Sequence, residues 1–216
     1  FLKKIRKIAN DKKIILIFDE CTSGFRQTYG GLHKLYKINP DMAIFGKALG
    51  NGYAINAIIG KKSIMEKCNS TFISSTFWTE RVGPTAALAT LDVMKKIKSW
   101  KVISNIGNKI KNNWKKIAKS HKLDLNIGGI DAIPNFTFQS KNHLIYKTFI
   151  TQEMLKKKIM SSNAVYCSIS HKEKLLNKYF DILNDLFYKI SFFEKNNIDE
   201  SEFLETRICK SGIREK

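Results

Sequence analysis

A lysine and an aspartate, each placed directly after a short apolar run, carry the chemistry that this sequence suggests. Asp19 closes one run, and Lys47 follows Gly46 at the end of a second. A lysine amine that is shielded from water can attack an aldehyde, and a carboxylate can keep a heterocyclic ring nitrogen protonated. One lysine and one aspartate therefore meet the minimal demand of a reaction in which an aldehyde takes up an amino group.

The segments around both residues match two motifs that occur in this order in one family. Residues 18–26 look like a D-E-x-x-x-G-F-R segment, and residues 40–47 look like a P-D-x-x-x-x-G-K segment. Two motifs at the family's separation are more specific than either alone. From about Lys12 to about Phe193, the sequence resembles the class III pyridoxal-phosphate-dependent aminotransferases, the group that includes glutamate-1-semialdehyde aminomutase.

The resemblance implies a cofactor and three residues that contact it. The cofactor is pyridoxal phosphate (PLP), Lys47 carries the Schiff base, and Asp19 contacts the pyridine nitrogen. Cys21 stands where the family usually has valine beneath the cofactor ring, which keeps an apolar contact but adds a thiol. Without the joint pattern, Asp19 could cap a loop and Lys47 could be a solvated lysine in a glycine turn.

A fourth residue is implied for the phosphate of the cofactor. The family places a hydroxyl-bearing segment of the neighbouring subunit there, and aligning on Pro84 selects Thr79, with Ser75 and Thr76 as weaker alternatives. We expect a helix to begin at Thr79, where free backbone N–H groups favour a phosphate. The alternative is an ordinary N-cap threonine. If Thr79 serves the partner's cofactor, the active unit is a homodimer.

The function implied by the resemblance is amino-group transfer. We expect a PLP-dependent aminotransferase or aminomutase, similar to glutamate-1-semialdehyde aminomutase, that uses a small-molecule amino donor and an oxo acceptor. A transaminase of an oxo-sugar or a 2-oxo acid is the alternative, because residues 50–54 replace a glycine-rich segment that more often ends in proline. Arg26 could bind a substrate carboxylate, although a structural ion pair is the commoner role of such an arginine.

Strands and helices alternate along the chain and position these residues. The run over residues 12–20 is typical of a strand buried on both faces of a parallel sheet, and residues 42–45 predict a second strand. Both strands would deliver their last residues to the edge of the sheet where ligands bind. Further helices are expected over residues 79–97, 101–121 and 151–161, and an amphipathic helix to residue 187 should follow a capping box at 170–173. Strands are expected at residues 135–138 and 164–169.

The expected fold class is α/β. Residues 1–122 would form part of the PLP-binding large domain of a fold-type I PLP-transferase, with a mostly parallel sheet and helices. Residues 123–216 would form a small C-terminal α/β domain. Only eighteen residues precede Asp19, so the phosphate loop, the stacking aromatic residue and the amino-terminal substrate segment of the family are absent from this sequence. We therefore expect a fragment that is inactive in isolation and that exposes sheet edges and apolar surface.

Composition restricts the environment of the protein. With 43% hydrophobic residues over 216 residues, the chain can bury a sizeable core. Its longest apolar run, residues 14–18, is far shorter than the ~18 residues of a membrane span, so no membrane partner is expected. The four cysteines are widely separated and no histidine lies at metal-ligand spacing. These features predict no metal site and no disulfide framework, which fits the cytoplasm.

The net charge of +19 gives the alternative of another class, a basic nucleic-acid-binding module. However, the lysines are spread along the whole chain, and no known nucleic-acid motif is present. We therefore expect no nucleic-acid partner. An inactive remnant that survives as an interaction surface is a further alternative.

Overall fold

The computed structural model describes residues 1–77 and 79–211, and the chain divides into two compact units, Phe1–Val102 and Ile103–Lys216. The division falls inside helix α5 (Ser99–Ser120). The expected boundary after residue 122 concerns the family's PLP-binding and small domains, and it stays a prediction.

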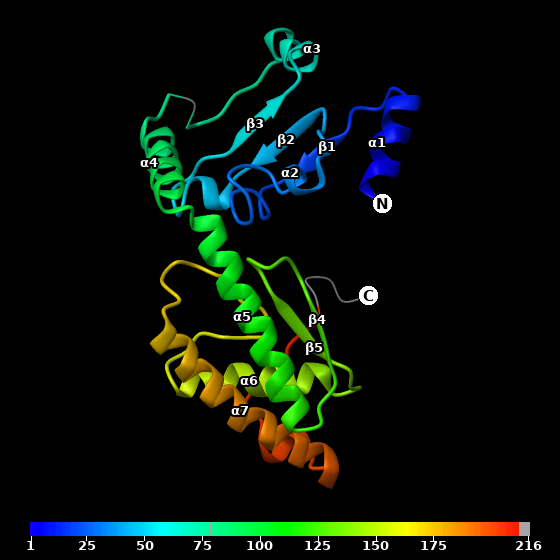
Figure 1. The fold of residues 1–216 in the computed structure, drawn as a ribbon, viewed down its shortest axis with the longest axis vertical. Helices are drawn as coiled ribbons and strands as arrows, with labels where there is room; N and C mark the ends of the chain where they lie inside the picture. Colours follow the sequence, from blue (N-terminus) through cyan, green and yellow to red (C-terminus); the bar gives the residue numbers. More distant parts are fainter. Residues whose placement is uncertain (78, 212–216) are drawn as a thin grey trace. The chain divides into compact units, whose positions relative to one another are not determined.

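The first unit is built on a three-stranded sheet with the order β1-β2-β3 (Figure 1). β1 (Ile17–Asp19) runs parallel to β2 (Met42–Phe45), and β2 runs antiparallel to β3 (Ala57–Gly60). The bounds of β2 are those predicted from its apolar run. The expected mostly parallel sheet is thus represented in this unit by one parallel and one antiparallel pairing.

The apolar run before Asp19 is not buried on both faces, so this part of the prediction was wrong for the chain itself. Ile14, Ile15 and Ile17 keep 57%, 53% and 49% of their surface exposed. β1 lies at the edge of the sheet, where β2 pairs with one side of it. This run therefore has more apolar surface than its neighbours in this chain cover.

Helix α4 (Val82–Ile97) packs on the sheet of the first unit. Its Ala87 forms a buried apolar cluster with Ala43 and Phe45 of β2 and with Leu49. Because Leu49 belongs to the segment that follows β2, this cluster ties that segment to the sheet and to α4. The other helices of the unit are α1 (Leu2–Asp11), α2 (His33–Tyr36), η1 (Lys47–Leu49), α3 (Lys62–Met65) and η2 (Glu66–Ser70).

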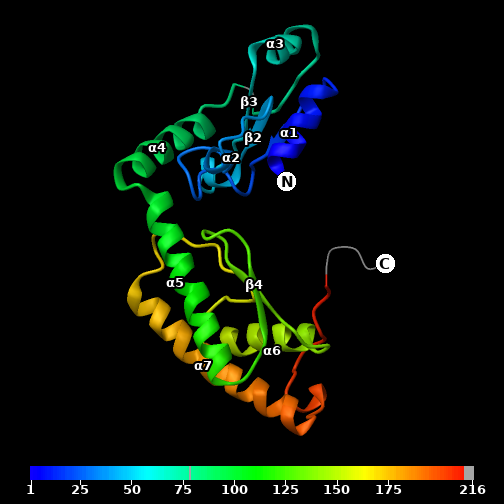
Figure 2. The same ribbon diagram turned by 45° about the vertical axis from the view of Figure 1, so that its right-hand side comes forward.

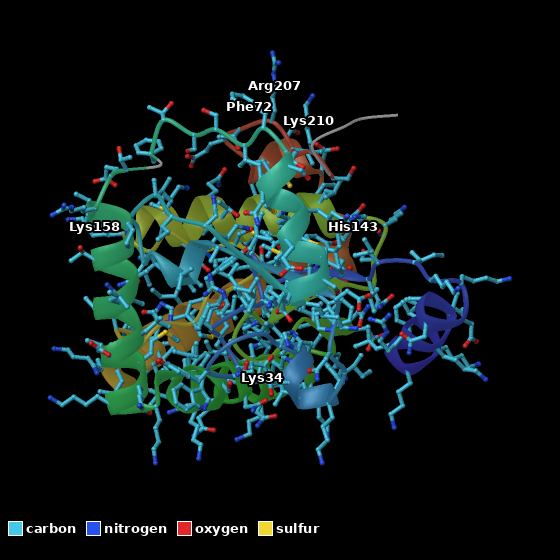
Figure 3. All side chains as sticks on the ribbon, turned by 90° about the horizontal axis from the view of Figure 1, so that it is seen from above. Lys34, Phe72, His143, Lys158, Arg207 and Lys210 are labelled. Carbon is cyan, nitrogen blue, oxygen red and sulfur yellow. The ribbon has the colours of Figure 1, made fainter. Side chains whose placement is uncertain are left out.

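Most of the described residues between η2 and α4 are exposed to solvent. Phe72, labelled in Figure 3, keeps 94% of its surface exposed, and Phe77 keeps 60%. α4 begins at Val82, three residues later than the predicted start at Thr79. Glu80 accounts for the later start, because its carboxylate accepts hydrogen bonds from the backbone N–H groups of Val82 and Gly83.

The second unit combines a hairpin with three helices. β4 (Leu125–Gly128) pairs antiparallel with β5 (Asn135–Phe138), and α5, α6 (His143–Lys156) and α7 (Glu173–Asn196) gather around them (Figures 1 and 2). Trp114 is fully buried, packs against Phe136 and donates a hydrogen bond from its indole N–H to the hydroxyl of Tyr179 at 2.9 Å. Burying side chains of this size is worth about 1.5–3 kcal/mol each, which gives this unit a core of its own.

Three predictions for the second unit need correction. The helix expected over 151–161 is α6, which begins eight residues earlier, at His143. The strand expected over 164–169 is reduced to one bridge between Asn135 and Ala164. The capping box at 170–173 does not form, because α7 begins at Glu173 with Lys172 as its N-cap and no side-chain cap hydrogen bond.

The described part of the tail after α7, residues 197–211, packs on α6, and the sequence predicted no structure for it. It contains η3 (Glu200–Glu202), and the ring of Phe203 stacks on Phe193 with centroids 4.1 Å apart. The backbone N–H of Glu205 donates to the side chain of Gln152, and that of Cys209 donates to the Thr148 hydroxyl. Within residues 1–77 and 79–211, no helix has the length and apolar character that crossing a membrane requires.

Candidate active site

The parallel pairing of β1 and β2 brings the segments after both strands to one edge of the sheet. Asp19 lies opposite Ile44, and the backbone N–H of Glu20 donates to the Ile44 carbonyl at 2.8 Å. Three residues beyond this pair, one segment reaches Thr22 and the other reaches Lys47. Side chains that are far apart in the sequence therefore meet at the carboxyl ends of the two strands, the edge where α/β sheets bind ligands.

Lys47 is held by its backbone and by a hydroxyl. Its ammonium donates a hydrogen bond to the Thr22 hydroxyl, with Nζ and Oγ1 2.6 Å apart. Its φ of +44° is unusual for a residue with a side chain, and it begins the short helix η1. Gly46 precedes this turn, and a Cβ there would lie 2.3 Å from Oδ1 of Asn56, so a larger residue would displace the Asn56 side chain. The amine itself remains accessible to solvent.

Asp19 is an ionised carboxylate. The backbone N–H of Cys21 donates to its Oδ1 at 3.0 Å. This hydrogen bond, with the Cys21 thiol and the positive charge of Lys47, lowers the pKa of Asp19 below its ordinary value and outweighs the effect of its partial desolvation. Asp19 and Lys47 are therefore close enough for the two charges to interact, as the paired role predicted for them requires.

Cys21 lies beside both charged groups and is half-buried. Partial burial, followed by its contact with the Asp19 carboxylate, raises the pKa of the thiol, and the positive charge of Lys47 opposes this rise only in part. The thiol therefore stays protonated near neutral pH and is a weak nucleophile. It acts here as a hydrogen-bond donor to Asp19.

Glu20 anchors the loop that follows the site. Its carboxylate is 4% exposed and accepts hydrogen bonds from the backbone N–H groups of Leu32 and His33, at 2.9 and 3.0 Å, and from the Ser23 hydroxyl. Burial alone would raise the pKa of Glu20, but these hydrogen bonds and one to the His33 ring hold it below the ordinary value. The loop over residues 20–33 is thus tied to the end of β1.

Thr79 lies in a turn before α4 and is exposed. The N-cap of α4 is Arg81, so Thr79 is not an N-cap threonine. The backbone N–H groups of Val82 and Gly83 donate hydrogen bonds to the Glu80 carboxylate at 2.8 and 3.2 Å. A phosphate at these two groups would compete with Glu80, and the assignment of Thr79 to a phosphate stays a prediction.

Arg26 and Thr22 complete the site. The Arg26 Nε donates to the Thr22 carbonyl at 2.7 Å, which gives this arginine a structural contact. Thr22 was missed from the sequence because it occupies a variable position of the D-E-x-x-x-G-F-R segment. The strand register seen in the structure reveals it, since Thr22 and Lys47 each follow the pair Asp19 and Ile44 by three residues.

The residues at this edge fit a cofactor that carries an aldehyde and a ring nitrogen. An accessible amine and an ionised carboxylate lie within electrostatic reach of each other at the ends of two parallel strands. The amine is the group that an aldehyde takes up, and the carboxylate is the group that keeps a ring nitrogen protonated.

Comparisons with known proteins point to one family. The family description Aminotransferase class-III matches residues 1–162. The 3-aminobutyryl-CoA aminotransferase of Cloacimonas acidaminovorans is 35% identical over 153 residues, covering 70% of this chain and 37% of that protein. The glutamate-1-semialdehyde 2,1-aminomutase of Methanococcoides burtonii is 31% identical over 144 residues, covering 65% of this chain and 34% of that protein.

The fold is also found among solved structures. The FumI protein of Sphingopyxis sp. MTA144, in its PLP internal aldimine form, superposes with a TM-score of 0.83 at 19% identity, covering 94% of this chain and 50% of that chain. The chain thus spans half or less of the length of these proteins.

Proposed function

Because the chain belongs to the class-III aminotransferase family, we propose that Lys47 is the lysine that binds PLP and that Asp19 is the partner of its ring nitrogen. The family uses PLP, and the chain has the α/β fold of PLP-dependent transaminases of fold type I over the part that it spans. The observation that carries the proposal is the meeting of Asp19 and Lys47 at one sheet edge, with charges that interact.

The mechanism assigns one task to each side chain. When bound, PLP supplies an aldehyde that takes up the amino group and a protonated ring that draws electrons from the reacting carbon. Lys47 would hold the cofactor through its ε-nitrogen and, when its amine is free, would accept the proton from the substrate Cα as a general base. Asp19 stays ionised and holds the proton on the ring nitrogen. Cys21 lies beside Asp19 and supports that carboxylate with two hydrogen-bond donors.

The specific reaction is proposed from the similarity to the relatives named above. The relatives named above comprise an aminotransferase and an aminomutase, and both reactions move an amino group. We favour an aminotransferase or an enzyme like glutamate-1-semialdehyde 2,1-aminomutase, acting in the cytoplasm. A transaminase of an oxo-sugar or a 2-oxo acid is the alternative, since the loop after Lys47 departs from the family's usual form.

The proposed active unit is larger than this chain. Its relatives are at least twice as long, so the activity is proposed for these residues together with a segment that binds the cofactor phosphate. We further propose a homodimer in which Thr79 of each subunit faces the phosphate in the other.

Turnover tests the proposal. In the complete protein saturated with PLP, Lys47→Ala should lower amino-group transfer from a panel of amino donors at least ~1,000-fold, because both the attachment point and the base are lost. Lys62→Ala is the matched control, since Lys62 is exposed and pairs only loosely with Glu66. Normal turnover by Lys47→Ala would refute the assignment.

A further inference from the structure

The hydroxyl of Thr22 is the hydrogen-bond partner of the Lys47 amine. The 2.6 Å contact between Oγ1 and Nζ joins the turn after β1 to the turn after β2. It follows from the parallel register, because each residue lies three positions beyond the pair Asp19 and Ile44. The register thus brings the two turns together, and the side-chain rotamers of Lys47 and Thr22 complete the contact.

The turn that carries Thr22 is anchored at each of its residues. The Thr22 carbonyl accepts from the Nε of Arg26 at 2.7 Å. On either side, the Cys21 N–H donates to Asp19 and the Ser23 hydroxyl donates to Glu20. The backbone of Thr22 is thus held in place before any ligand arrives, as expected of a residue that orients another.

A hydroxyl suits both charge states of a lysine. It accepts a hydrogen bond from an ammonium, and it can donate its own proton toward the lone pair of a neutral amine. Being neutral, it also places no additional negative charge beside the amine, as a carboxylate in the same place would. The neighbouring Ser23 hydroxyl donates to Glu20 and therefore has a different partner.

We propose that Thr22 is a positioning residue that holds the ε-nitrogen of Lys47 at the edge shared with Asp19, in both the protonated and the neutral state. The inference rests on the function proposed above for Lys47 and adds the group that orients it. Thr22 touches the amine and not the reacting carbon, so its effect is on the placement of the base.

The first experiment uses the cofactor-free protein. Trace labelling with acetic anhydride at several pH values, read by mass spectrometry, reports how reactive each lysine amine is. Thr22→Val removes the hydroxyl at nearly constant shape, so Lys47 should be labelled roughly three- to tenfold faster as its lone pair loses a donor. Thr22→Ser should restore the slow rate, and Thr85→Val, at an exposed threonine of α4, should leave it unchanged.

The second readout uses the PLP-loaded protein. Thr22→Val should lower kcat roughly tenfold with little change in KM, because a misplaced base slows proton removal and not substrate binding. Thr22→Ala provides the same test if the valine variant does not fold. Equal labelling of Lys47 in the wild type and in Thr22→Val, or a Thr22→Ser variant that behaves like Thr22→Val, would overturn the proposal.

The two proposals fail in different ways. Labelling of the cofactor-free protein reports the Thr22 contact whether or not PLP binds. Loss of the Thr22 effect with normal attachment of PLP to Lys47 would refute the positioning role alone, whereas attachment of PLP elsewhere would refute the proposed function itself.

Discussion

At the scale of single residues, each of the two proposed functional groups is held by a close neighbour in one turn. Cys21 donates to Asp19, and Thr22 accepts from Lys47. The turn thus controls both the charge of the carboxylate and the place of the amine. Substitutions within it should change chemistry at the site without dismantling the sheet.

Removing the thiol of Cys21 should change the ionisation of Asp19. In Cys21→Ala the backbone hydrogen bond remains but the thiol donor is lost, so the pKa of Asp19 should rise from its lowered position toward its ordinary value. Since the pKa of Asp19 is lowered in the folded wild type, its carboxylate takes up a proton only at low pH. In Cys21→Ala this protonation should occur at a higher pH. Carbon-13 NMR titration of labelled aspartate side chains measures the change.

Cys68→Ala is the control for this titration, since Cys68 is an exposed free cysteine. An Asp19 titration that is the same in Cys21→Ala and in the wild type would show that the thiol does not act on the carboxylate.

The sequence predicted the charged pair but not the residues that contact it. Asp19 and Lys47 each belong to a motif with fixed residue types, and their shared position follows from two strand ends. Thr22 occupies a variable motif position, and its role depends on a register that periodicity alone does not reveal. The sequence also did not show that Glu80 would accept hydrogen bonds from the first N–H groups of α4, because the helix was expected to begin at Thr79.

At the scale of elements, short strands and amphipathic helices were predictable, whereas elements decided by tertiary contacts were not. α5 presents Ile103, Ile110, Trp114 and Ile117 to the core at helical spacing, and its predicted range was nearly correct. α6 begins with a stretch rich in β-branched and aromatic residues, a composition that favours strands. Its burial among β5, α7 and the tail overrides that preference.

Asp41 links several elements of the first unit through one carboxylate. It pairs with Arg6 of α1 at 2.9 Å and with Lys61 after β3 at 2.6 Å, and it accepts from the Leu16 N–H at 2.8 Å. Asp41→Asn should lower the free energy of unfolding by about 1.5–3 kcal/mol, the range for hydrogen bonds to a charged group. Urea unfolding measures this loss.

The loss should depend on pH in a defined direction. These contacts hold the pKa of Asp41 well below its ordinary value, so their contribution is complete above about pH 4 and disappears as the pH falls further toward the lowered pKa. The difference between the wild type and Asp41→Asn should therefore shrink in acid. Asp11→Asn, at the end of α1, is the control, and an equal loss in both variants would contradict this role.

Gly107 allows α5 to approach a loop of the second unit. A Cβ at this position would lie 1.5 Å from the Asp131 carbonyl oxygen. Gly107→Ala should therefore destabilise the second unit by about 3 kcal/mol or more, because backbone must move to admit the methyl group. Thermal unfolding measures the effect against Asn108→Ala, an exposed neighbour on the same helix. Equal melting temperatures would show that the approach is not tight.

At the scale of the whole molecule, the chain presents more apolar sheet surface than it covers. Ile15 and Ile17 on one edge and Ile58 and Ile59 of β3 on the other are each about half exposed. Produced alone, the chain should associate with rising concentration, because unpaired edges and apolar patches pair with other surfaces.

Introducing charge at the β1 edge should reduce this association. Ile15→Glu and Ile17→Glu should each raise the monomer fraction in sedimentation-velocity runs. Leu155→Glu, at an exposed leucine of the second unit, should change it less. A wild-type chain that stays monomeric at high concentration would contradict the account of this surface.

Attachment of the cofactor tests the central claim most directly. Borohydride reduction of the complete protein in the presence of PLP fixes the cofactor to the lysine that holds it, and peptide mapping then locates that lysine. We predict a single modified site at Lys47, lost in Lys47→Ala and retained in Lys62→Ala. Cofactor fixed at a different lysine, or no fixed cofactor in a protein that transfers amino groups, would contradict the assignment.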